Sequence, residues 1–66
     1  MKNKIKVQRA MHDMTQADLA EKIGVSRQTI NAMEKSKYVP STVLALKIAQ
    51  LFRTPLEEIF FLEGDE

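Results

Sequence analysis

The apolar residues of this 66-residue chain recur at intervals of three and four, the spacing at which side chains share one face of an α-helix. The alternation that is typical of β-strands never persists along the sequence. Together with local start and stop signals, the pattern predicts five short helices, at about residues 4–12, 16–23, 27–35, 42–52 and 55–60. We therefore expect an all-α fold.

Polar residues that favour helix N-termini stand directly before three of these segments. Thr15, Ser26 and Ser41 can each accept a hydrogen bond from an amide in the first turn. Gly24 follows the second segment, and a glycine there can adopt the left-handed conformation that ends many helices. The run Thr54-Pro55-Leu56-Glu57 combines an N-cap, a proline at the first helical position and a capping-box glutamate.

The first predicted helix has the least regular pattern. Its spacing places Ile5 and Met14 in the core and Val7 in water. Gln8 falls at an inward position, where an apolar residue is expected.

Composition excludes several classes of site. The chain has no cysteine and one histidine, His12, so neither disulfides nor a metal site are expected, and no cofactor is expected. No stretch approaches the roughly 18 apolar residues of a membrane span, and no signal-peptide pattern is present, so we expect a cytoplasmic protein. A chain of this length forms one domain with a small core, and association with a second copy commonly stabilises such domains.

Charge is unevenly divided along the chain. Residues 1–38 hold eight Lys or Arg against four acids, whereas residues 39–66 hold two against five. The net charges of +4 and −3 indicate one face suited to a polyanion. Chance unevenness on a solvated surface is an equally open alternative.

The segment from Gln16 to Lys35 has the features of two helices that cross steeply through a short turn. Ala20 provides the small residue at the crossing, and Gly24 provides the glycine of the turn. The apolar residues that would lock the two helices together are Leu19, Val25, Ile30 and Met33.

Residues 4–60 resemble the Cro/C1-type (Xre-like) helix-turn-helix regulators. The matching features are Thr15-Gln16, Gly24-Val25-Ser26, Glu34 and Pro40-Ser41. The resemblance implies that residues 1–66 form a single compact five-helix lambda-repressor-like domain. Its core would span residues 4–60, and residues 61–66 would form a C-terminal tail. Two residues depart from the family: Gln8 replaces a usual leucine, and Arg53 stands where glycine or asparagine is frequent.

The resemblance also implies roles for individual residues. The positions that touch base edges are Arg27, Gln28 and Asn31, and those that touch phosphates are Gln16, Ser26, Lys35, Lys37 and Tyr38. The chemistry agrees, because Arg can pair with guanine, and Gln or Asn with adenine, through two hydrogen bonds. An ordinary solvated helix face, followed by solvated loop lysines, is the alternative. Glu34 is expected to bind a nearby backbone group or an arginine.

The run Ile59-Phe60-Phe61-Leu62 places four apolar residues together near the end of the chain. Ile59 and Phe60 can close the core, and exposed apolar residues beside them indicate an interface. We expect a homodimer through this segment, with Ile59, Phe61 and Leu62 as candidate interface residues, bound to a palindromic DNA site. Alternatively, Phe61 and Leu62 fold back over the first helix.

The sequence therefore predicts a sequence-specific double-stranded DNA-binding transcriptional regulator, most simply a dimeric repressor with no small-molecule effector. An enzyme is not expected, since no nucleophile–base pair, metal-ligand cluster or phosphate-binding glycine loop is present. The alternative is an antitoxin-like protein-interaction module, although only six residues follow Phe60 to serve as an extended binding segment.

Overall fold

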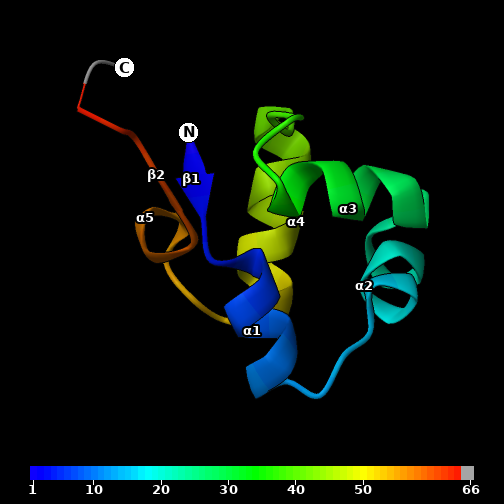
Figure 1. The fold of residues 1–66 in the computed structure, drawn as a ribbon. Helices are drawn as coiled ribbons and strands as arrows, with labels where there is room; N and C mark the ends of the chain where they lie inside the picture. The colour runs from blue at the N-terminus through cyan, green and yellow to red at the C-terminus, as the bar shows by residue number, and fades with distance from the viewer. Residues whose placement is uncertain (65–66) are drawn as a thin grey trace.

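The computed structural model describes residues 1–64, so the acidic positions 65–66 of the predicted tail lie outside the described residues. Within that range five helices and two short strands are arranged as Figure 1 shows. In chain order they are β1 (Lys2–Asn3), α1 (Ile5–Met11), α2 (Gln16–Ile23), α3 (Arg27–Glu34), α4 (Thr42–Phe52), α5 (Leu56–Ile59) and β2 (Phe60–Phe61). The five predicted helices are confirmed to within one residue at each end.

Neither β1 nor its pairing with β2 within one chain was predicted. β1 and β2 pair in antiparallel register, with Lys2 opposite Phe61 and Asn3 opposite Phe60, and the amide of Lys4 donates to the carbonyl of Ile59 at 2.8 Å. Two-residue strands are too short to produce a detectable alternation, and their partners are far apart in the sequence. The segment after α5 thus folds back onto its own chain, which is the alternative expected for Phe61.

Every helix contributes to one hydrophobic core. The buried apolar residues are Ile5, Leu19, Ala20, Ile23, Ile30, Met33, Ile48, Phe52, Ile59 and Phe60. Ile59 is fully buried among them, so its assignment to a dimer interface is wrong: it has no exposed side-chain surface for a second copy to contact. Val7 faces solvent and Gln8 faces inward, as expected.

Gln8 is the one buried polar residue in the described part of the chain. Its Oε1 atom is buried and has no hydrogen-bond partner within residues 1–64. An unpaired buried acceptor costs about 1–3 kcal/mol, so this side chain weakens the fold at a position where an apolar one would stabilise it.

Side-chain caps fix the ends of the central helices. Thr15 and Asp18 form a reciprocal capping box, in which each backbone amide donates to the other side chain at 3.0 Å. The amide of Thr15 holds the pKa of Asp18 below its usual value. Gly24 ends α2 with φ 76°, and Ser26 accepts a hydrogen bond from the amide of Thr29 at 3.1 Å.

The predicted cap of α5 does not form. Thr54 Oγ1 donates to the carbonyl of Phe52 at 2.9 Å, and Pro55 precedes the first helical residue. The helix therefore begins one residue later than predicted, and Glu57 is one position too early to close a capping box.

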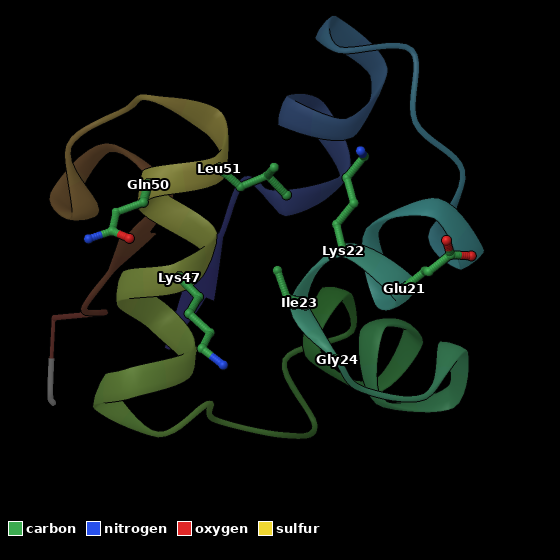
Figure 2. A pocket seen from close by; sticks show the side chains of 7 residues that line it. All are labelled: Glu21, Lys22, Ile23, Gly24, Lys47, Gln50 and Leu51. Atoms are coloured by element: carbon green, nitrogen blue, oxygen red, sulfur yellow. The ribbon is translucent and has the colours of Figure 1, made fainter.

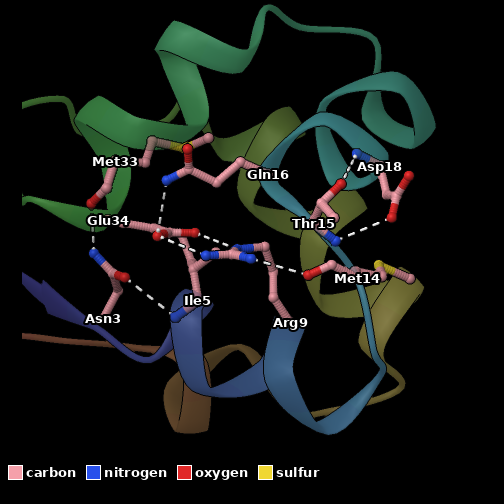
Figure 3. A network of polar contacts seen from close by, with 9 residues as sticks. All are labelled: Asn3, Ile5, Arg9, Met14, Thr15, Gln16, Asp18, Met33 and Glu34. Carbon is pink, nitrogen blue, oxygen red and sulfur yellow. Dashed lines mark hydrogen bonds and ion pairs between the residues drawn. The ribbon is translucent and has the colours of Figure 1, made fainter.

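A polar network ties the first three helices and β1 together (Figure 3). Arg9 Nε lies 2.5 Å from Glu34 Oε2, Arg9 Nη2 donates to Glu34 Oε1 at 3.1 Å, and Arg9 Nη1 donates to the carbonyl of Met14 at 2.9 Å. Gln16 Nε2 donates to Glu34 Oε1 at 3.2 Å. The predicted pairing of Glu34 with an arginine is confirmed, and this hydrogen bond raises the pKa of Arg9.

The same network reaches β1. Asn3 Nδ2 donates to the carbonyl of Met33 at 2.7 Å, and Asn3 Oδ1 accepts from the amide of Ile5 at 3.2 Å. The C-terminal end of α3 is thereby held by side chains from β1, α1 and α2, which fixes the direction in which α3 points.

Replacement of Arg53 should stabilise the fold. Arg53 ends α4 at φ 50° and ψ 42°, a left-handed conformation that is unfavourable for most side chains. Since asparagine tolerates it, Arg53→Asn should raise the free energy of unfolding by about 0.5–1 kcal/mol in urea titrations followed by circular dichroism. The control is Lys47→Asn, inside α4, which should lose a few tenths of a kcal/mol. Equal or lower stability of Arg53→Asn than wild type would contradict the interpretation.

Removal of one partner from the Arg9–Glu34 pair should cost more than removal of both. Glu34→Leu leaves a largely buried guanidinium without its counter-charge, so we expect a loss of about 3–5 kcal/mol in the same titration. Arg9→Met combined with Glu34→Leu should lose less than half as much, because no unpaired charge remains. The single variant Arg9→Met is measured as well. If the stability lost by the double variant equals the sum of the losses in the two single variants, the two residues are not coupled.

Candidate DNA-binding site

The two sides of α3 differ sharply in character. Ile30 and Met33 are fully buried on its inner side, whereas Arg27 and Gln28 are exposed and Asn31 is half-buried on its outer side. These three polar side chains surround one hollow of about 240 Å³. The structure therefore brings together the three residues predicted to touch base edges.

The start of α3 is held by a pair of hydroxyl groups. Ser26 Oγ accepts from the amide of Thr29 and lies 2.9 Å from Thr29 Oγ1. Ser26, predicted to touch a phosphate, is thus also the N-cap of α3, at the helix end where amides and the helix dipole favour an anion.

A second hollow, of about 500 Å³, lies where the start of α2 approaches the start of α3. Gln16 and Arg9 line it, and Arg27 borders both this hollow and the one on α3. Gln16 uses its amide nitrogen to bind Glu34, so the side chain predicted to touch a phosphate also braces α3.

The remaining predicted phosphate contacts follow α3 directly. Lys35, Lys37 and Tyr38 are all exposed. Ser36 has φ 59°, and the amide of Lys37 donates to the carbonyl of Ala32 at 2.9 Å, which turns the chain sharply at the end of the helix. The two lysines thus project from a turn with fixed backbone hydrogen bonds.

Arg9 is the residue of this region that the sequence interpretation missed. It follows Ile5 and Gln8 at the spacing of one helix face, and that spacing was the available signal. A charged residue on an inward face needs a counter-charge, and Glu34, although 25 residues away, provides it.

Another hollow lies elsewhere, between the end of α2 and the second half of α4 (Figure 2). It has a volume of about 590 Å³, and Ile23 and Leu51 reach toward it while Lys22 and Lys47 stand at its rim. Its lining contains no nucleophile paired with a base. This hollow is therefore not an alternative to α3 as the candidate functional site.

Residues 1–64 lack two further kinds of feature. No group of three or more His, Cys, Asp or Glu side chains is placed to hold a metal ion. No helix in this range is both long and apolar enough to cross a membrane.

Comparison with known proteins agrees with this geometry. A family model described as helix-turn-helix matches residues 5–59. The chain is 61% identical over 66 residues to an uncharacterized HTH-type transcriptional regulator of Methanocaldococcus jannaschii, with 100% of both chains covered. It is 51% identical over 65 residues to the uncharacterized HTH-type transcriptional regulator YgzD of Bacillus subtilis, with 98% of each chain covered. An uncharacterized HTH-type transcriptional regulator of Archaeoglobus fulgidus is 47% identical over 66 residues, which cover 100% of this chain and 93% of the relative. The chain belongs to the Cro/C1-type helix-turn-helix family.

Proposed function

We propose that this protein is a DNA-binding transcriptional regulator that inserts α3 into the major groove. The observation that carries the proposal is the gathering of Arg27, Gln28 and Asn31 around one hollow, on a helix whose other face is fully buried. The relatives described above are transcriptional regulators by name, which agrees with this function.

Residues on the outer face of α3 discriminate between bases. Arg27 can donate two hydrogen bonds to guanine, and Gln28 and Asn31 can each both donate to and accept from adenine. Their backbone is held by the Ser26 cap at one end and by the Arg9–Glu34 network at the other, so little conformational freedom is lost on binding.

Contacts with the sugar-phosphate backbone of the DNA provide the affinity. We assign these to Gln16 and Ser26 at the starts of α2 and α3, and to Lys35, Lys37 and Tyr38 after α3. Such contacts position the protein without reading sequence. A domain of this kind acts most simply as a repressor, by occupying a promoter in the cytoplasm.

We further propose that the protein binds a palindromic site as a homodimer. Leu62 is 68% exposed after β2, and on α4 Val43 and Leu46 are 65% and 46% exposed. In Figure 1 the segment after β2 and the start of α4 lie at the same end of the molecule, with β1 between them. We name Val43, Leu46 and Leu62 the C-terminal apolar surface and assign the contact between the two copies to it.

Phe61 is left out of the proposed interface. Its ring lies beneath Lys4 Nζ, which is 6.0 Å from the ring centroid, and it lines a different groove, between α1 and α5. Neighbouring strand residues point to opposite faces, and Phe60 occupies the inward one.

Substitutions in the two classes of contact should have different effects on DNA binding. Gln28→Ala should weaken binding to a duplex selected from a random pool by about 1–3 kcal/mol and leave a scrambled duplex nearly unaffected. Lys35→Ala or Lys37→Ala should weaken both duplexes alike and reduce the salt dependence by about one unit of slope per lost contact.

The measurement is a pair of titrations for each variant across a salt series. Equal losses for both duplexes in Gln28→Ala would mean that this residue does not read a base. A wild-type protein that prefers no duplex sequence would contradict the regulator proposal and favour a protein-interaction module.

The homodimer can be tested by sedimentation. Leu46→Glu combined with Leu62→Glu should give monomers with unchanged helical content, because the apolar contact would then bury unpaired carboxylates. Val7→Glu, at an exposed apolar residue of α1, is the matched control and should remain dimeric. A wild-type protein that sediments as a monomer at all accessible concentrations would rule the dimer out.

A further inference from the structure

Asn3 is the residue of β1 that contacts α3. Its Nδ2 donates to the carbonyl of Met33 at 2.7 Å, and its Oδ1 accepts from the amide of Ile5 at 3.2 Å. The residue is half-buried. One side-chain amide thus joins the last turn of α3 to the start of α1, as Figure 3 shows.

The carbonyl of Met33 belongs to the end of a helix. The last four carbonyls of an α-helix have no partner within the helix itself. This one accepts from the amide of Ser36 at 3.0 Å, in the turn that follows α3, and Asn3 adds a second donor. Asn3 therefore holds both the end of α3 and the turn from which Lys35 and Lys37 project.

The backbone of Asn3 is itself fixed by the other end of the chain. Asn3 stands opposite Phe60 in the β1–β2 register, and the next amide, that of Lys4, donates to the carbonyl of Ile59 at 2.8 Å. Phe60 and Ile59 are both buried in the core. The side chain of Asn3 thus connects α3 to a part of the molecule that cannot shift without disturbing the core.

The two ends of α3 are held in different ways. Ser26 caps the first turn, and Gln28 lies close to this cap, about 3 Å along the helix axis, whereas Asn31 lies about 7.5 Å along it. A helix that swings about its cap therefore displaces Asn31 more than Gln28. Glu34 restrains the C-terminal end from α1 and α2, and Asn3 restrains it from β1, so the two restraints act from different elements.

We propose that Asn3 is a positioning residue for DNA reading, because it holds the C-terminal end of α3 where Asn31 can meet a base. The inference rests on the proposed function of α3. Without the bond from Asn3, this end of the helix would have to be ordered on binding, and the cost would weaken base contacts more than contacts with random DNA. A strand outside the helix-turn-helix thereby contributes to specificity.

The first test is Asn3→Ser, which removes the donor to Met33 and keeps a hydroxyl that can accept from the amide of Ile5. It should bind the selected duplex about three- to tenfold more weakly than wild type, and a scrambled duplex within about twofold, with unchanged helical content by circular dichroism. A domain that is merely less stable would lose the same factor on both duplexes, and that result would overturn the proposal.

The wild-type titration separates this inference from the function on which it rests. A wild-type preference for the selected duplex that persists undiminished in Asn3→Ser overturns the role of Asn3 alone. A wild-type protein without any preference overturns the proposed function.

The second variant is Asn3→Asp. Aspartate has nearly the same shape and keeps the acceptor, but it has no hydrogen to donate when ionised, so it should lose at least as much discrimination as Asn3→Ser. Lys2→Gln, at the exposed neighbouring residue of β1, lowers the net charge by the same amount and should weaken both duplexes alike. Equal behaviour of Asn3→Asp and Lys2→Gln would reduce the effect to charge and overturn the proposal.

Hydrogen exchange tests the same bond without DNA. In Asn3→Ser the amides of Ser36 and Lys37, which donate to carbonyls of the last turn of α3, should exchange about three- to tenfold faster. The amide of Thr29, which donates to the cap at the start of α3, should be unchanged. Equal acceleration of all three amides, or no acceleration at Ser36 and Lys37, would overturn the proposal.

Double variants locate the effect along α3. In an Asn31→Ala background, Asn3→Ser should weaken binding to the selected duplex by less than about twofold, because the contact that it positions is already absent. In a Gln28→Ala background it should keep its full effect. Equal losses in the two backgrounds would overturn the assignment of Asn31 as the contact that Asn3 positions.

Discussion

The ion pair between Arg9 and Glu34 is the contact on which the geometry of the molecule depends. It joins the middle of α1 to the last residue of α3, and the same two side chains also hold the carbonyl of Met14 and the amide of Gln16. A helix of eight residues has little surface with which to fix its own direction. The pair supplies that direction because its charges are largely removed from water and must remain together.

A second constraint is that the two sides of α3 lie in different environments, the core and the surface. Its inner side fills the centre of a small core, and its outer side carries no apolar residue large enough to pack. The core can accept this arrangement only because α1, α4 and α5 contribute large aliphatic and aromatic residues from other directions. Core packing therefore does not determine the residue type at Arg27, Gln28 and Asn31. Other residues can replace them while the fold persists.

Most of the fold could be predicted, because the dominant signals are local. Helix periodicity, the caps at Thr15 and Ser26 and the turn at Gly24 act within a few residues. The β1–β2 pairing and the partner of Arg9 depend on residues brought together from distant parts of the chain, and no local pattern encodes them. The candidate site could be predicted from the turn geometry and the resemblance. That the side-chain oxygen of Gln8 is unpaired is evident only from the three-dimensional structure.

The pairing of β1 with β2 has a consequence for how the protein is made. Lys2 and Asn3 find their strand partners only at positions 61 and 60. The carbonyl of Ile59 that receives the amide of Lys4 is equally late. While the chain is growing on the ribosome, α1 remains without one side of its packing until residues 59–61 have emerged. Closure of the fold is thus a late event in synthesis, set by the longest loop in the molecule.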